Sequence, residues 1–178
     1  MVHFLKDGKH FIWASERDGY NHLYLYQMDG KLVNQITKGP WSIHSAGGGV
    51  YWLRQAVTAI DNENNLIYFT ALKKSSIERH LYRIKFDGTQ QERLTKEDGT
   101  HRITFSPDSK YYFDAYSNIS SLPSLALYKN SGELIKIIAR PHPEKLAKFD
   151  IQYPELLTIP ARDGFPLPAE LLKPKDFN

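Results

Sequence analysis

A recurring strand, turn and strand unit constrains the fold of this chain more than any other feature. The unit opens with His-Leu-Tyr, continues through an apolar stretch to a turn with Gly in second place, and ends on a second apolar strand. Two full copies and one degraded copy occur: His22-Leu23-Tyr24 with Asp29-Gly30 and Leu32 to Thr37, His80-Leu81-Tyr82 with Asp87-Gly88 and Leu94-Thr95, and Leu125 to Tyr128 with Ser131-Gly132 and Leu134 to Ile138. Apolar residues that alternate on both sides of Asp-Gly are typical of a β-hairpin, and we expect two-residue turns in which Gly takes the positive φ.

A second shared element precedes each copy, namely a polar turn followed by an aromatic strand. These elements begin at Leu5, Ile60 and Phe105, so they recur roughly every 50 residues, a period typical of one four-stranded propeller blade. The sequence therefore predicts an all-β chain of about three four-stranded blades of a β-propeller. We expect the blades at approximately residues 1–55, 56–102 and 103–149, with 1–149 as a partial propeller.

The last 30 residues follow a different pattern. Pro141 to Phe149 is predicted to form one short helix with Leu146, Ala147 and Phe149 on its inner side. We then expect residues 150–178 to form a linker and one hairpin, with strands Glu155 to Ile159 and Leu167 to Leu172 around an Asp163-Gly164 turn.

Composition indicates a globular β protein without a nucleic-acid footprint. Hydrophobic residues make up 41% and aromatic residues 13%, enough for a core of half-buried strands, while the net charge is only +3. The densest basic positions, Lys73-Lys74 and Lys173 with Lys175, are expected on a solvated surface. There is no cysteine, no apolar run of membrane-span length and no signal-peptide pattern at the N-terminus.

Several residue groups resemble sites, but each has a plainer structural interpretation. Ser15, Asp18 and His22 are the residue types of a catalytic triad, but no elbow or oxyanion hole accompanies them, so we expect a capped turn. The stretch Asp61 to Asn65 lacks the central Gly and the twelfth-position Glu of a calcium loop, which favours an inter-strand turn. We predict neither a metal nor a cofactor.

Histidines, glycines and aromatic residues give further hypotheses. His22 and His80 occupy equivalent blade positions, which indicates a structural hydrogen-bonding role, and His142 is expected to be exposed. Asn118-Ile119-Ser120 matches a glycosylation sequon. Ala46 to Arg54 contains three glycines and is expected to form a bulged connection between blades, with contact to a partner or the central cavity as the alternative. Four aromatic residues are expected in blade cores, with a carbohydrate site as the alternative: Trp41, Trp52, Tyr111 and Tyr112.

Taken in order, these motifs resemble the dipeptidyl peptidase IV family of serine peptidases, in the prolyl oligopeptidase clan. The stretch from Ser15 to Tyr26, SERDGYNHLYLY, is the most specific part, and PELLTIPARDGFPLPAELLKP at Pro154 to Pro174 is the last. The resemblance implies the last part of an eight-bladed propeller that leads into the first hairpin of an α/β-hydrolase domain. It also implies a parent enzyme that releases N-terminal dipeptides from peptides, with the propeller restricting access.

The resemblance transfers no site residue to this chain. The G-x-S-x-G elbow, the Gly-Gly-Pro segment and the Glu-Glu pair of the family are absent from the sequence, so we expect no hydrolysis by the chain alone. A periplasmic or cell-envelope location is expected for the parent, and its peptide substrates, the other blades and the hydrolase domain are the expected partners. Two alternatives remain: a self-standing binding or sensor propeller in the envelope, and an open three-blade module that self-associates through exposed blade faces.

Overall fold

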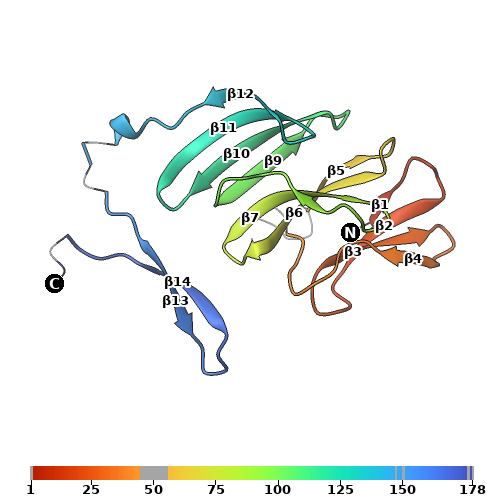
Figure 1. Cartoon of the computed structure of the whole chain (residues 1–178), viewed down its shortest axis with the longest axis horizontal. Coiled ribbons are helices and arrows are strands. Elements are labelled where there is room, and N and C mark those ends of the chain that lie inside the picture. The colour runs from red at the N-terminus through yellow and green to blue at the C-terminus, as the bar shows by residue number, and fades with distance from the viewer. Residues whose placement is uncertain (1, 45–55, 147, 150, 176, 178) are drawn as a thin grey trace.

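The computed structural model describes residues 2–44, 56–146, 148–149, 151–175 and 177, and Figure 1 shows their arrangement. The first sheet is an antiparallel meander in the order β1-β2-β3-β4, which we call blade 1. Its strands are β1 (Val2–Phe4), β2 (His10–Ser15), β3 (His22–Gln27) and β4 (Leu32–Gln35).

Two further meanders share one eight-stranded sheet. Blade 2 contains β5 (Val57–Asp61), β6 (Leu66–Ser75), β7 (Glu78–Lys85) and β8 (Glu92–Arg93). Blade 3 contains β9 (Thr100–Phe105), β10 (Tyr111–Asn118), β11 (Ser121–Lys129) and β12 (Leu134–Ala139). The pairing inside each blade is antiparallel, and a parallel pairing of Arg79 with Thr100 joins β7 to β9. The prediction of about three four-stranded blades is confirmed, whereas the predicted blade limits stay predictions.

The hairpin turns have three residues rather than the expected two. In the β3–β4 turn, the Gln27 amide donates to the Lys31 carbonyl and the Gly30 amide donates to the Gln27 carbonyl, with Gly30 at φ 90°. The same pair of bonds closes the β7–β8 and β11–β12 turns and the turn of the C-terminal hairpin, between β13 (Glu155–Pro160) and β14 (Pro166–Leu171). The extra residue is the G1 bulge, in which a left-handed Gly follows a type I turn and restores the strand twist.

Blade 2 packs against both of its neighbours, because successive side chains of β6 point to opposite faces. Ile67 and Phe69 join a buried cluster with Ile12 and Trp41 on the side of blade 1. Tyr68, between them in sequence, joins a second cluster with Leu81, Leu94, Ile103 and Tyr112 on the side of blade 3. Burial of each large apolar side chain contributes about 1.5–3 kcal/mol, so these two clusters supply most of the stability of the stack of three blades.

The predicted helix at Pro141 to Phe149 is wrong. Among the described residues of this segment the structure has a single 3-10 turn, Pro143–Lys145, and Phe149 is 57% exposed rather than on an inner side. A segment this short contains too few residues to repay the cost of nucleating an α-helix, and it carries two prolines.

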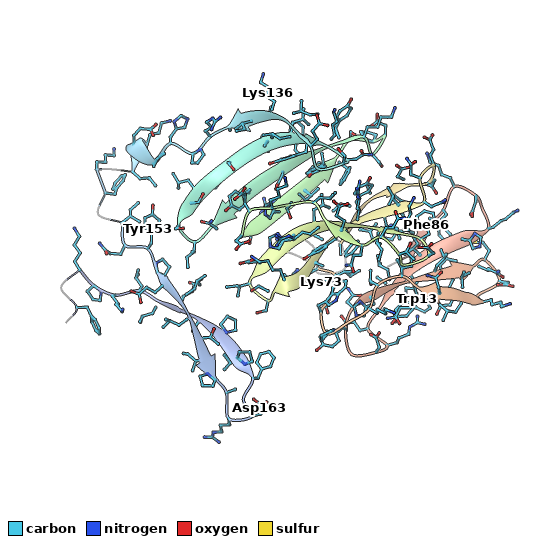
Figure 2. All side chains as sticks on the ribbon, in the orientation of Figure 1. Trp13, Lys73, Phe86, Lys136, Tyr153 and Asp163 are labelled. Carbon is cyan, nitrogen blue, oxygen red and sulfur yellow. The ribbon has the colours of Figure 1, made fainter. Side chains whose placement is uncertain are left out.

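The C-terminal hairpin matches the expected strands within one residue. It pairs β13 (Glu155–Pro160) with β14 (Pro166–Leu171), and Leu156, Ile159 and Leu167 are exposed. Figure 1 shows the hairpin apart from the blades, and Figure 2 shows Asp163 at its tip. Across the residues that the structure describes, no helix has the length and apolar character needed to span a membrane.

Candidate functional site

His22 and His80 have the same structural role in their blades, as predicted. Nδ1 of His22 lies 3.0 Å from the Thr37 hydroxyl, which also accepts a hydrogen bond from the Leu23 amide. His80 repeats the arrangement with Thr95 at 3.1 Å and the Leu81 amide. Both rings are fully buried. Nε2 of each ring faces an acceptor, the Gly39 carbonyl for His22 and the Glu78 carboxylate for His80, so Nε2 carries a proton and Nδ1 accepts from the threonine hydroxyl.

The three residues that resemble a triad do not come together. His22 Nε2 donates to the Gly39 carbonyl, while the Ser15 hydroxyl accepts from Arg17 Nε. Asp18 accepts from the Tyr24 hydroxyl and the Gln35 amide instead of contacting either residue. The Ser15 to His22 stretch is therefore a hydrogen-bonded turn, in agreement with the structural interpretation.

The calcium-like stretch is also a turn. The Asp61 carboxylate accepts from the backbone amides of Glu63 and Asn64 and from the Asn64 side chain. Both carboxylate oxygens are thus used inside the turn, and an ion would have to displace these donors.

The side-chain nitrogen of Asn118 in the sequon is also occupied. It donates to the Tyr116 hydroxyl at 2.7 Å and to the Asp98 carbonyl at 3.3 Å. Because Asn118 Nδ2 is the atom that glycosylation would modify, attachment of a glycan requires both bonds to break.

The aromatic candidates differ in exposure. Trp41 is buried against His22 and Phe69, and Tyr112 is 1% exposed, so these two are blade-core residues as expected. Tyr111 is 44% exposed on the opposite face of β10, which contradicts a core position for it. Trp52 and the Ala46 to Arg54 stretch lie outside the described residues.

The paired lysines and His142 have ordinary surface contacts. Lys73 lies 5.2 Å from the centre of the Trp41 ring and bonds to Gln91, whereas Lys173 pairs with Glu155 in the hairpin. The His142 side chain is 60% exposed and contacts Glu144. None of these contacts indicates a binding site.

A charged cluster lies at the junction of blades 2 and 3. The His80 ring and the carboxylates of Glu78 and Asp98 each offer one atom that could bind a metal. These three atoms lie within 4.8 Å of one another, an arrangement that resembles a metal site. The Lys74 ammonium contacts both carboxylates, at 2.9 Å from Glu78, and so already provides the cation between them. These two bonds raise the pKa of Lys74. Burial tends to raise the pKa of Glu78, but its bonds to His80 and Lys74 hold it below the usual range.

A buried hydrogen-bonded pair, His101 with Asp114, lies beside this cluster. His101 Nδ1 is 2.7 Å from Asp114 Oδ2, and His101 Nε2 is 2.9 Å from the Glu97 carbonyl. The His101 ring stacks on Tyr116 and lies 5.2 Å from the His80 ring. Both ring nitrogens of His101 therefore face oxygen atoms of the protein.

Asp114 and His101 also line a crevice of about 710 Å³. We call it the blade 2–3 crevice: the segment Leu94 to Glu97 after β8 forms one wall, and side chains of β10, β11 and β12 form the other. Tyr112, Asp114 and Tyr116 alternate along β10 to face it, because every second residue of a strand shares a face. The volume is within the range of about 300–1,000 Å³ that is usual for ligand sites.

Sequence reasoning missed this crevice and the hydrogen-bonded pair of His101 and Asp114. His101 is not part of a His-Leu-Tyr motif, and Asp114 lies on the next strand, so spacing along the chain does not connect them. The available signal was a charged residue at an inward position of an aromatic strand, Tyr112, Asp114 and Tyr116.

Comparisons with known proteins relate the chain to a family of peptidases. The family model described as "Dipeptidyl peptidase IV (DPP IV) N-terminal region" matches residues 1–123. Dipeptidyl peptidase 4 of Trichophyton tonsurans is 28% identical over 176 residues, which cover 96% of this chain and 21% of the relative. A probable dipeptidyl-aminopeptidase B of Tuber melanosporum is 36% identical over 102 residues, covering 56% of this chain and 10% of that protein.

A solved structure gives the same fold. The crystal structure of Porphyromonas gingivalis dipeptidyl peptidase 4 matches 99% of this chain and 24% of its own chain, with a TM-score of 0.84 and 23% sequence identity. Nearly all of this chain matches the curated Trichophyton tonsurans relative, but the chain spans only about a fifth of that relative's length.

Proposed function

The chain belongs to the family of dipeptidyl peptidase IV N-terminal regions, and from this membership we propose that it is the non-catalytic propeller wall of a dipeptidyl peptidase. The observation that carries the proposal is the similarity to dipeptidyl peptidase 4 of Trichophyton tonsurans across 96% of the chain, blades and hairpin alike. The relatives' names describe those proteins, and their activity is proposed here for a longer polypeptide that contains this chain.

The proposed mechanism assigns this chain a role in access rather than in bond cleavage. Three blades held together by two buried clusters form a rigid wall, and the Glu155 to Leu171 hairpin carries the chain towards a catalytic domain. An enclosed chamber admits short peptides with a free N-terminus and excludes larger ones, and it holds an admitted substrate close to the reacting groups. A periplasmic or cell-envelope location is part of the same proposal.

The proposal is tested with two proteins: this chain and the product of the complete reading frame that encodes it. Each is incubated with a short peptide that has a free N-terminus and with its N-acetylated form, and the products are identified by mass spectrometry. We expect dipeptide release from the free peptide by the complete product, and none from this chain. A complete product without dipeptide release would overturn the proposal and favour a binding propeller, and hydrolysis by this chain alone would overturn the non-catalytic role.

A further inference from the structure

Blade 2 places a carboxylate beside its buried histidine where blade 1 does not. His22 is fully buried with its Nε2 2.9 Å from the Gly39 carbonyl, and Tyr20 stands two residues before it. His80 is equally buried, but the residue two positions before it is Glu78, whose carboxylate lies 3.0 Å from Nε2. Because a backbone carbonyl is enough to hold the ring in blade 1, the structural role of the histidine does not account for the carboxylate in blade 2.

A second carboxylate comes from the connection between blades 2 and 3. The Asp98 backbone is held there, because its carbonyl accepts from the Tyr116 hydroxyl at 3.0 Å and from the Asn118 side chain at 3.3 Å. One atom each of the Asp98 carboxylate, the Glu78 carboxylate and the His80 ring lie within 4.8 Å of one another. One imidazole nitrogen and two carboxylate oxygens are suitable ligands for a divalent transition metal such as Zn²⁺.

The Lys74 ammonium marks the position of a cation in this cluster. It contacts both carboxylates, and Glu78 Oε2 lies 2.9 Å from Lys74 Nζ and 3.0 Å from His80 Nε2. The side chains of Glu78, Lys74 and Asp98 are 19%, 33% and 65% exposed, so an ion reaches this position from solvent. Lysine has a flexible four-carbon stem and a strongly hydrated charge, so it can turn out to water when a doubly charged ion takes its place.

The distances fit a metal after a small adjustment of side chains. Bonds of about 2.0–2.2 Å to zinc place neighbouring ligand atoms about 3.4 Å apart. The separation of 3.0 Å between Glu78 and His80 then opens slightly, and the exposed Asp98 carboxylate moves inwards on its fixed backbone. The buried ring of His80 does not have to move.

We propose that Glu78, His80 and Asp98 bind one divalent transition-metal ion such as Zn²⁺, which joins blade 2 to blade 3. The two carboxylates provide one oxygen each, His80 provides Nε2, and Lys74 turns out to solvent. The proton of the His80 ring is then on Nδ1 and is donated to the Thr95 hydroxyl oxygen, which lies 3.1 Å away. All three ligands come from this chain, so the site is independent of the proposed peptidase function.

The test measures binding of Zn²⁺ to this chain by isothermal calorimetry at about pH 7.5, with Mg²⁺ and Ca²⁺ as hard cations. We expect one saturable zinc site with a dissociation constant below about 100 μM and much weaker binding of Mg²⁺ and Ca²⁺, which prefer oxygen ligands alone. Because the ligands come together only in the folded chain, Zn²⁺ should also raise the urea midpoint. Weaker or absent zinc binding, or equal affinity for Ca²⁺, would overturn the proposal.

Two variants locate the ion and two others are controls. Asp98→Asn removes one exposed ligand and should weaken zinc binding by at least about tenfold. Lys74→Met removes the competing ammonium and should strengthen zinc binding, whereas a purely structural ion-pair network predicts no gain. His10→Asn and His142→Asn remove imidazoles that each contact a single carboxylate, and should leave the affinity unchanged. Binding that survives Asp98→Asn, does not strengthen in Lys74→Met, or is lost in either control contradicts the assigned site.

Discussion

Three buried histidines, His22, His80 and His101, use both ring nitrogens, but their partners differ. His22 and His80 each accept from a threonine hydroxyl through Nδ1 and donate through Nε2, to a carbonyl and a carboxylate respectively. His101 faces two acceptors instead. The first pair could be predicted from the sequence because the motif repeats with its threonine, whereas the His101 pair depends on the register of β9 with β10, which no local pattern encodes.

His80 should make the stability of the chain depend on pH. Burial lowers its pKa, and the bond to Glu78 only partly opposes that effect. The unfolded chain therefore binds a proton at this ring at a higher pH than the native chain does. The contribution of the ring to the free energy of unfolding is fully present above the unfolded pKa of about 6.5, and it is lost as the pH drops towards the lower native pKa. We expect the urea midpoint to decrease between about pH 7.5 and 5, and His80→Asn to flatten that decrease.

A second variant separates this effect from the loss of any imidazole. His142→Asn removes a ring whose side chain is 60% exposed, and its pH profile should follow that of the parent chain. Glu78 and Asp98, with lowered pKa values, lose their contributions only as the pH falls below about 4.5, outside the window for His80. An unchanged slope in His80→Asn above pH 5 would show that the ring does not titrate with folding.

At the scale of elements, one turn geometry connects the outer strands of every blade. The side chain before each Gly accepts from the amide after it: Asp29 from Lys31, Asp87 from Thr89 and Ser131 from Glu133. This explains why the degraded third copy still folds, since the Ser hydroxyl replaces the Asp carboxylate as acceptor. Asp-Gly and Ser-Gly thus predicted the turn positions correctly, although the length of the turn is set by the strand twist.

Gly88 and Gly30 make a matched pair for testing how blades 1 and 2 pack. Both have positive φ, at 82° and 90°, so alanine at either position should cost about 1–2 kcal/mol for the left-handed backbone. A Cβ on Gly88 would also lie 2.9 Å from the Ile36 carbonyl oxygen of blade 1, whereas one on Gly30 meets nothing within 4 Å. We expect Gly88→Ala to lower the free energy of unfolding by at least about 1 kcal/mol more than Gly30→Ala, as measured by urea denaturation. Equal losses would show that the turn does not press on blade 1.

The strands were easier to predict than the segments between blades. Alternating aromatic residues identified the hairpins, and β13 and β14 differ from their predicted bounds by one residue. Pro141 to Phe149 was misjudged because its apolar spacing resembles a helix, although a helix that short needs packing against a neighbouring surface to persist. Similarly, Tyr111 and Tyr112 are adjacent aromatic residues on one strand, and only the position of the neighbouring blade shows that Tyr112 is buried and Tyr111 is exposed.

At the scale of the whole molecule, blade 2 is covered on both faces, but blades 1 and 3 are each covered on one. Phe4 and Trp13 are 68% and 41% exposed on the outer side of blade 1. Phe113 and Ile138, at 43% and 47%, are exposed in blade 3. Figure 2 shows Trp13 and Lys136 at the two ends of the stack. Apolar surface of this kind on a sheet favours association.

We therefore expect the isolated chain to self-associate through these outer faces. Sedimentation velocity should show a weight-average mass above 20.6 kDa that rises with concentration, together with binding of a hydrophobic dye. The double variant Phe4→Lys with Phe113→Lys places one charge on each outer face, away from both buried clusters, and should shift the chain towards monomer without lowering its urea midpoint. The single variant Glu63→Lys adds the same two units of positive charge at an exposed turn position, controls for net charge and should associate like the parent chain. A monomer at high concentration that binds no dye would mean that the outer faces are not adhesive on their own.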